Sequence, residues 1–137
     1  MRFMMLMLPN GYQNAPPGTL PTADAIATMR KYNESLQKAG VLMALDGLQP
    51  PSVGGARVTF SGGKPEIKDG PFTEAKEVVG GFWIIQVKSR EEALEWASRC
   101  PAPPGDVIEV RQFLEFSDFP PDVQEAMMNM PAIEGET

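Results

Sequence analysis

Histidine is absent from this chain of 137 residues, and cysteine occurs once, at Cys100. Without histidine the chain cannot form a Ser-His-Asp triad, a Cys-His pair or a histidine-based metal site. A single cysteine excludes an internal disulfide framework and a thiolate metal site, and it fits a reducing compartment. Any catalysis must use carboxylates, Tyr, Lys, Arg, Cys100, backbone groups or a bound cofactor, and the sequence points to neither a metal nor a cofactor.

Long apolar runs and an excess of positive charge are also lacking. The apolar run at the start, Phe3 to Leu8, is too short to span a bilayer, and no small-residue cleavage site of a signal peptide follows it. The formal net charge is −6 and the sequence pI is about 4.6. This balance argues against a nucleic-acid partner and against an anionic membrane surface. We therefore expect a cytoplasmic protein.

The order of apolar patterns and turn residues predicts one α+β domain over 1–116, with a tail over 117–137 that holds a short helix at 122–130. Within the domain the expected order is strand, helix, strand, hairpin, strand, helix, strand. The expected strands cover 2–8, 41–45, 57–60, 65–68, 82–87 and 107–113, and the expected helices cover 23–39 and 90–100. Thr22 is the expected N-cap of the first helix, and Ser89 with Glu92 reads as a capping box for the second.

Two helices on a mixed sheet, with one face of the sheet left over, form a ferredoxin-like βαββαβ-type pattern with an added hairpin. The strand at 82–87 is the most apolar in the chain and is expected to be central. Both faces of this strand are apolar, because Phe82 and Ile84 alternate with Trp83 and Ile85. We therefore expect both faces to be buried against other elements. A second copy of the chain would supply that cover, which predicts a two-fold dimer.

Asp69 begins the stretch "DGPF", which has a structural and a functional interpretation. In the structural one, Asp69 caps a turn, Gly70 supplies a positive φ, Pro71 fixes the next φ, and Phe72 anchors the loop in the core. In the functional one, the rigid turn holds the Asp69 carboxylate at the mouth of a cleft as an acceptor or a catalytic base.

Three further polar residues are candidates for ligand binding. Glu109 and Arg111 are two residues apart on the last strand and so point the same way. On a face closed by a dimer mate they would form either an interfacial ion-pair network or a polar pocket. Asn33 falls within the apolar stripe of the first helix, where it is either a satisfied buried amide or part of the site. Gly80 and Gly81 favour a bulge or a close backbone approach over a phosphate-binding loop.

The stretches "DGPFTEAKEVVGGFWII", "SREEALEWASRCP" and "IEVRQF", together with "YNESLQKAGVLMALDGLQPP", closely resemble the YCII-related family, in particular the subgroup named for its Asp-Gly-Pro-Phe motif. The resemblance covers roughly residues 2–114. It implies a ferredoxin-like subunit that pairs into a dimeric α/β barrel. Some members of this family are companions of extracytoplasmic-function sigma factors, and some relatives carry a His-Asp pair thought to be an active site. This chain departs from that pattern because it has no histidine.

Three functional hypotheses follow. In the first, the protein is a small homodimer that binds a small, anionic molecule in a cleft at the barrel mouth through Asp69, Glu109, Arg111 and Asn33, with or without weak enzymatic activity. In the second, it is a non-catalytic regulatory or interaction module associated with a sigma factor. In the third, which rests on fold analogy alone, it is a cofactor-independent enzyme like others on dimeric α/β barrels. A pocket lined by Asp69, Glu109 and Arg111 would favour the first.

Overall fold

A computed structural model describes residues 1–129 of the chain. Its strands are β1 (Arg2–Leu8), β2 (Leu42–Gly47), β3 (Ala56–Ser61), β4 (Lys64–Asp69), β5 (Gly81–Gln86) and β6 (Val107–Gln112). Its α-helices are α1 (Ala23–Lys38), α2 (Arg90–Ser98) and α3 (Pro121–Met128), and short 3₁₀ turns cover Tyr12–Asn14 and Phe116–Asp118. The predicted α+β order is confirmed. Met130, the expected end of the last helix, lies outside the described residues.

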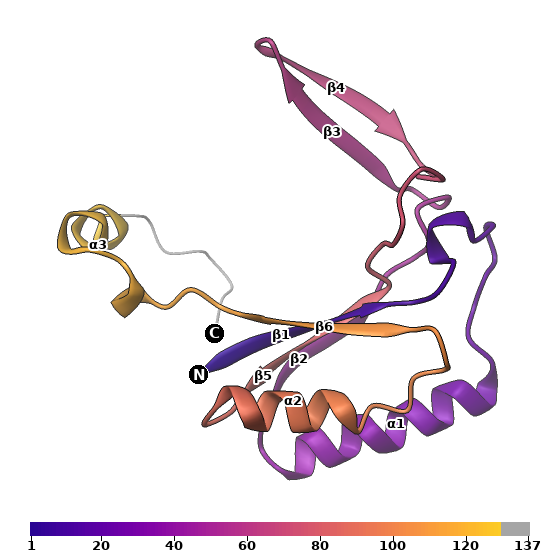
Figure 1. The fold of residues 1–137 in the computed structure, drawn as a ribbon, viewed down its shortest axis with the longest axis horizontal. Helices are drawn as coiled ribbons and strands as arrows, with labels where there is room; N and C mark the ends of the chain where they lie inside the picture. The colour runs from indigo at the N-terminus through magenta and orange to yellow at the C-terminus, as the bar shows by residue number, and fades with distance from the viewer. Residues whose placement is uncertain (130–137) are drawn as a thin grey trace.

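Four strands form the main sheet in the order β2-β5-β1-β6, with β5 in a central position as predicted. Every neighbouring pair in this sheet is antiparallel, so the expectation of a mixed sheet was wrong. The parallel relation that a β-α-β crossover creates is still present, because α1 joins β1 to β2 across the intervening β5. This strand order is consistent with a ferredoxin-like fold. Figure 1 shows α1 and α2 side by side on one face of the sheet.

The core lies between that face and the two helices. Phe3 and Met5 of β1 and Trp83 and Ile85 of β5 are buried there, because alternate residues of a strand point to the same face. Leu36 is the fully buried contribution of α1. Two of the core's aromatic rings, those of Tyr32 and Trp83, meet edge to face with centroids 5.9 Å apart. The Tyr32 hydroxyl donates to the carbonyl of Trp96 at 2.6 Å, which ties α1 to α2.

Both helices begin where the sequence predicts. The Thr22 side chain accepts a hydrogen bond from the amide of Ala25, and the Ser89 side chain accepts one from the amide of Glu92. The second half of the predicted capping box differs, because the Glu92 carboxylate accepts from the amide of Lys88 at 2.9 Å and not from that of Ser89. In residues 1–129 no helix combines the length and the apolar character needed to cross a membrane.

β2 runs two residues further than the expected 41–45, since Asp46 and Gly47 remain paired with β5. The pairing shifts register between Leu42 and Ala44, which marks a bulge near the start of the strand. Gly81 explains the close pairing at the other end, because a Cβ there would lie 3.0 Å from the carbonyl oxygen of Asp46. The predicted close backbone approach is therefore confirmed at Gly81, whereas the near neighbour of Gly80 is the ring of Pro9.

β3 and β4 form a separate two-stranded sheet that projects from the domain as an arm (Figure 1). The turn between them places Gly62 and Gly63 at φ 60° and 90°, as a two-residue hairpin turn requires. The pairing puts Val58 opposite Ile67 and Phe60 opposite Pro65, so one face of the arm is apolar. Phe60 and Ile67 are 82% and 73% exposed, and nothing in residues 1–129 covers this face.

The Asp-Gly-Pro-Phe segment lies at the base of this arm. Phe72 is buried as expected, and the guanidinium of Arg57 lies 4.2 Å from the centroid of its ring. Gly70 does not have the positive φ that the turn interpretation predicts. Glycine is needed there for a different reason: a Cβ on Gly70 would lie 1.9 Å from the carbonyl oxygen of Pro51. The Gly70 amide also donates to the carbonyl of Gly55 at 2.8 Å.

We expect Gly70→Ala to destabilise the protein by about 1–3 kcal/mol or more, because the added methyl meets backbone that has no side-chain freedom to move aside. Gly47→Ala is the matched control: its Cβ meets nothing within 4 Å and its φ is not positive. That control should leave stability within about 1 kcal/mol of the parent. Denaturant unfolding measures both. Equal midpoints for the two variants would contradict the close packing of Gly70 on Pro51.

Candidate functional site

Glu109 and Arg111 lie together on the sheet face that the helices leave open. The Arg111 Nη1 atom is 3.3 Å from Oε2 of Glu109. The antiparallel register puts Glu109 opposite Leu6 and Arg111 opposite Met4, and directly opposed residues share a face. Because β6 is an edge strand, apolar side chains of β1 flank the pair on one side, and the pair stays partly exposed.

Asn33 lies on the other side of the sheet, in the helix layer. Its Oδ1 atom accepts a hydrogen bond from Nε1 of Trp83 at 2.8 Å. This contact matches the interpretation of Asn33 as a satisfied amide, and it satisfies the indole N–H of a buried tryptophan. Within one chain the structure does not bring Asn33 to Glu109 and Arg111.

Asp69 is exposed at the end of β4, opposite Ala56 in the hairpin ladder. In the described residues its carboxylate has no hydrogen bond or ion pair. The ion pair of this region joins its neighbours, since Nζ of Lys68 lies 2.7 Å from Oε1 of Glu74. The structure thus does not place Asp69 with Glu109 and Arg111 in one pocket of a single chain.

The open face of the main sheet is apolar at its centre. Met4 and Leu6 of β1 and Phe82 and Ile84 of β5 face each other across the ladder, and all four are only half-buried. A shallow hollow of about 200 Å³ lies on this face and is lined by Met4, Leu6, Arg111, Gln112 and Phe113. By itself this hollow is too small to enclose most metabolites.

Arg2 fastens the chain beyond β6 to the start of β1. Its Nε and Nη2 atoms donate to the two carboxylate oxygens of Glu115 at 2.9 Å and 3.1 Å, a two-pronged contact. Hydrogen bonding from Arg2 lowers the pKa of the Glu115 carboxyl. The Arg2 guanidinium also lies 4.9 Å from the centroid of the Phe113 ring. These contacts set the direction in which the chain leaves the sheet toward α3.

A larger cleft, of about 590 Å³, lies on the helix side of the sheet. It is formed by the end of β1, the loop that leads to α1, the first turns of α1 and the loop before β6. Its lining is mostly apolar and includes Met7, Leu20, Ile26 and Met29, with prolines in both loops. None of the four candidate site residues predicted from the sequence lines it; of the residues discussed with them, only Gly80 does. In the sequence, the only sign of this cleft was the high proline content of its two loops, which are far apart in the chain.

Hydrogen bonds hold the walls of this cleft. The Tyr12 hydroxyl donates to the carbonyl of Leu48 at 2.6 Å, and burial raises the pKa of Tyr12. The Asp106 carboxylate accepts from the amide of Asn10 at 2.9 Å, which joins the two loops. Gly80 lies at the base, where a Cβ would meet the Pro9 ring at 2.5 Å.

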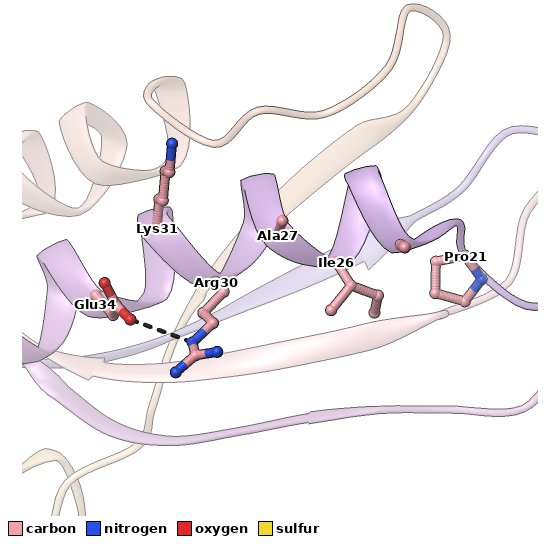
Figure 2. Close-up of a pocket in the computed structure, with 7 residues that line it drawn as sticks. Pro21, Ile26, Ala27, Arg30, Lys31 and Glu34 are labelled. Atoms are coloured by element: carbon pink, nitrogen blue, oxygen red, sulfur yellow. Dashed lines mark ion pairs between the residues drawn. The ribbon is translucent and has the colours of Figure 1, made fainter.

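A second depression continues along the outer surface of α1 (Figure 2). It shares Pro21 and Ile26 with the cleft, and beyond them it is lined by Ala27, Arg30 and other exposed residues of the same helix. The Arg30 guanidinium pairs with Glu34 across one helical turn at 3.3 Å. Because one helix supplies nearly all of its surface, this depression is open and cannot surround a ligand.

Comparison with known proteins shows the family of this chain. The model of the YCII-related domain matches residues 1–117. The chain belongs to the YCII-related domain family. It is also 38% identical over 74 residues to "Uncharacterized protein R00369" of Rhizobium meliloti (strain 1021). That match covers 54% of this chain and 56% of the relative, so the chain spans about half the length of the curated protein it matches.

In this member of the YCII-related family, the described residues support neither a metal site nor a reactive cysteine. In residues 1–129, no group of three or more Asp, Glu or Cys side chains is arranged to hold a metal ion. Burial raises the pKa of the Cys100 thiol to about 11, and the negative charge of Asp106 adds a smaller contribution in the same direction. A thiol with such a pKa stays neutral at physiological pH and is a poor nucleophile.

We expect Cys100 to react slowly with iodoacetamide at pH 8 in the native protein and much faster in urea. A rise in pKa from 9.0 to about 11 lowers the thiolate fraction at pH 8 by about a hundredfold. The native rate should increase as the pH approaches 11. Mass spectrometry of alkylated protein measures both rates, with Cys100→Ser as the blank. Equal rates for native and unfolded protein at pH 8 would show that the thiol is not shielded.

Proposed function

We propose that this protein is a homodimer of the Asp-Gly-Pro-Phe subgroup whose two open sheet faces meet in a dimeric α/β barrel, and that it binds a small anionic molecule beside Arg111. The observation that carries the proposal is a charged pair, Glu109 and Arg111, beside Met4 and Leu6 on an apolar face that no other segment of residues 1–129 covers.

The open face supports the dimer. Apolar side chains of β1 and β5 are half-buried on a surface that the domain's own helices do not reach. The hairpin arm adds the exposed side chains of Val58, Phe60 and Ile67. An isolated two-stranded hairpin is only marginally stable in water, so an arm of this kind gains most from packing on another surface. Figure 1 shows the arm and α3 rising from the two ends of the sheet, both away from α1 and α2.

Arg111 supports an anionic ligand. A guanidinium offers five N–H donors, and the described residues engage Arg111 in a single contact, with Glu109 at 3.3 Å. Arg111 lines the hollow together with Met4, Leu6 and Phe113, and its side chain is 70% exposed. When a second sheet lies over this hollow, water is excluded and the donors need a partner. A carboxylate or phosphate that accepts two parallel hydrogen bonds fits this requirement.

We expect sedimentation at micromolar concentration to show a particle of about twice the 14.9 kDa chain mass. Ile84→Glu should shift the particle toward the monomer, because it buries a charge in the proposed interface. Ile26→Glu is the matched control, since Ile26 is an exposed apolar residue of α1 on the opposite side of the sheet. A wild-type monomer would contradict the proposal and favour the alternative, an interaction module for a different protein such as a sigma factor.

The anion site predicts opposite effects for its two charged residues. With acetate, succinate and inorganic phosphate at constant ionic strength, we expect Arg111→Met to abolish ligand-induced thermal stabilisation. Glu109→Gln should strengthen it, because it removes the carboxylate that competes for the guanidinium. Calorimetric titration checks the affinities. Equal responses from the parent and both variants would show that any anion binds elsewhere.

A further inference from the structure

The structure assigns a second binding site to the cleft between the start of α1 and the loops around Pro9 and Pro103, and we propose that its ligand is a small organic cation with an apolar body and an ammonium group. The volume of about 590 Å³ lies within the range of small-molecule sites. The proposal is independent of the anion site, because the cleft lies on the helix side of the sheet and shares no lining residue with the hollow beside Arg111.

The charged side chains of the cleft have one sign. Asp24, in the first turn of α1, and Asp106, just before β6, both line it. Among the residues that the structure describes, no Lys or Arg lines it; the cations nearest along α1, Arg30 and Lys31, line the outer depression instead. The rest of the lining is mainly carbon. An apolar body with one positive charge matches this distribution, and a carboxylate ligand does not.

The hydroxyl groups of the cleft also favour a cation, because each already donates its hydrogen to a backbone carbonyl. Tyr12 donates to the carbonyl of Leu48, Thr19 to that of Pro16 at 2.7 Å, and Thr28 to that of Asp24 at 2.9 Å. The carboxylates can only accept when they are ionised. The side chains around the cleft therefore present acceptors without a spare donor. A ligand that bonds to these side chains must bring the hydrogens, and an ammonium group brings three.

The walls are formed before any ligand arrives. Pro9, Pro21, Pro101 and Pro103 fix their own backbone φ angles, and the Asp106–Asn10 contact at 2.9 Å joins the two loops. Gly80 allows the Pro9 ring to pack closely at the base, since a Cβ there would be 2.5 Å from it. A preformed cleft loses little conformational entropy on binding, so a small ligand can bind without a large conformational change.

The test uses three probes with a shared phenyl group: phenethylammonium, neutral 2-phenylethanol and anionic 3-phenylpropionate. Binding to the full chain is followed by the methyl NMR signals of ¹³C-methyl methionine, where Met7 and Met29 report on the cleft. We expect phenethylammonium to shift these two signals and to bind at least about tenfold more tightly than either other probe, the usual value of a charge-assisted contact.

Variants locate the site. Asp24→Asn and Asp106→Asn should each weaken phenethylammonium binding about five- to tenfold, and Ala25→Phe should block it by filling the cleft. Asp122→Asn, in the first turn of α3, is the matched control for a general loss of negative charge and should have no effect. Equal affinity for 2-phenylethanol would overturn the choice of a cation. Unshifted Met7 and Met29 signals, or binding unaffected by all three cleft variants, would overturn the site itself.

Discussion

The two central strands, β5 and β1, are apolar on both faces, while the helices in the described part of the chain cover only one of these faces. On the covered face, Trp83, Ile85, Phe3 and Met5 form the core with α1 and α2. On the other face, Phe82, Ile84, Met4 and Leu6 form a second apolar layer, and within residues 1–129 nothing packs over it. Domains are stable when each apolar face is packed against another element. The arrangement of the remaining elements follows from this asymmetry, because the hairpin and α3 both extend from the uncovered side.

The asymmetry also separates two kinds of surface chemistry. The uncovered face carries a guanidinium with unused donors among apolar residues, and it suits a partner that brings acceptors. The cleft at the start of α1 carries carboxylates among prolines and aliphatic side chains, and it suits a partner that brings donors. The sheet lies between them. The two proposed sites thus have opposite polarity and share no residues.

Periodicity and turn chemistry predicted the elements well, because local rules govern them. Thr22 and Ser89 cap their helices as expected, and the alternation along 107–113 put Ile108 and Val110 in the core and Glu109 with Arg111 outside it. The all-antiparallel pairing was not visible locally, since strand direction depends on the whole topology. The reason predicted for a glycine at position 70, a positive φ, was wrong. Glycine is needed there for its contact with Pro51, which joins segments that only the fold brings together. The cleft was missed for the same cause.

The packing of Gly70 on Pro51 separates two tasks of the hairpin. Backbone atoms hold the base of the arm, through the carbonyl of Pro51 and the hydrogen bond from Gly70 to Gly55. The strands beyond that base pair with each other and not with the main sheet. Substitutions on the apolar face of the arm are therefore expected to have little effect on the core. In the dimer that we propose, the arm would act as a specificity module: the choice of partner could diverge there while the scaffold and the cleft stay the same.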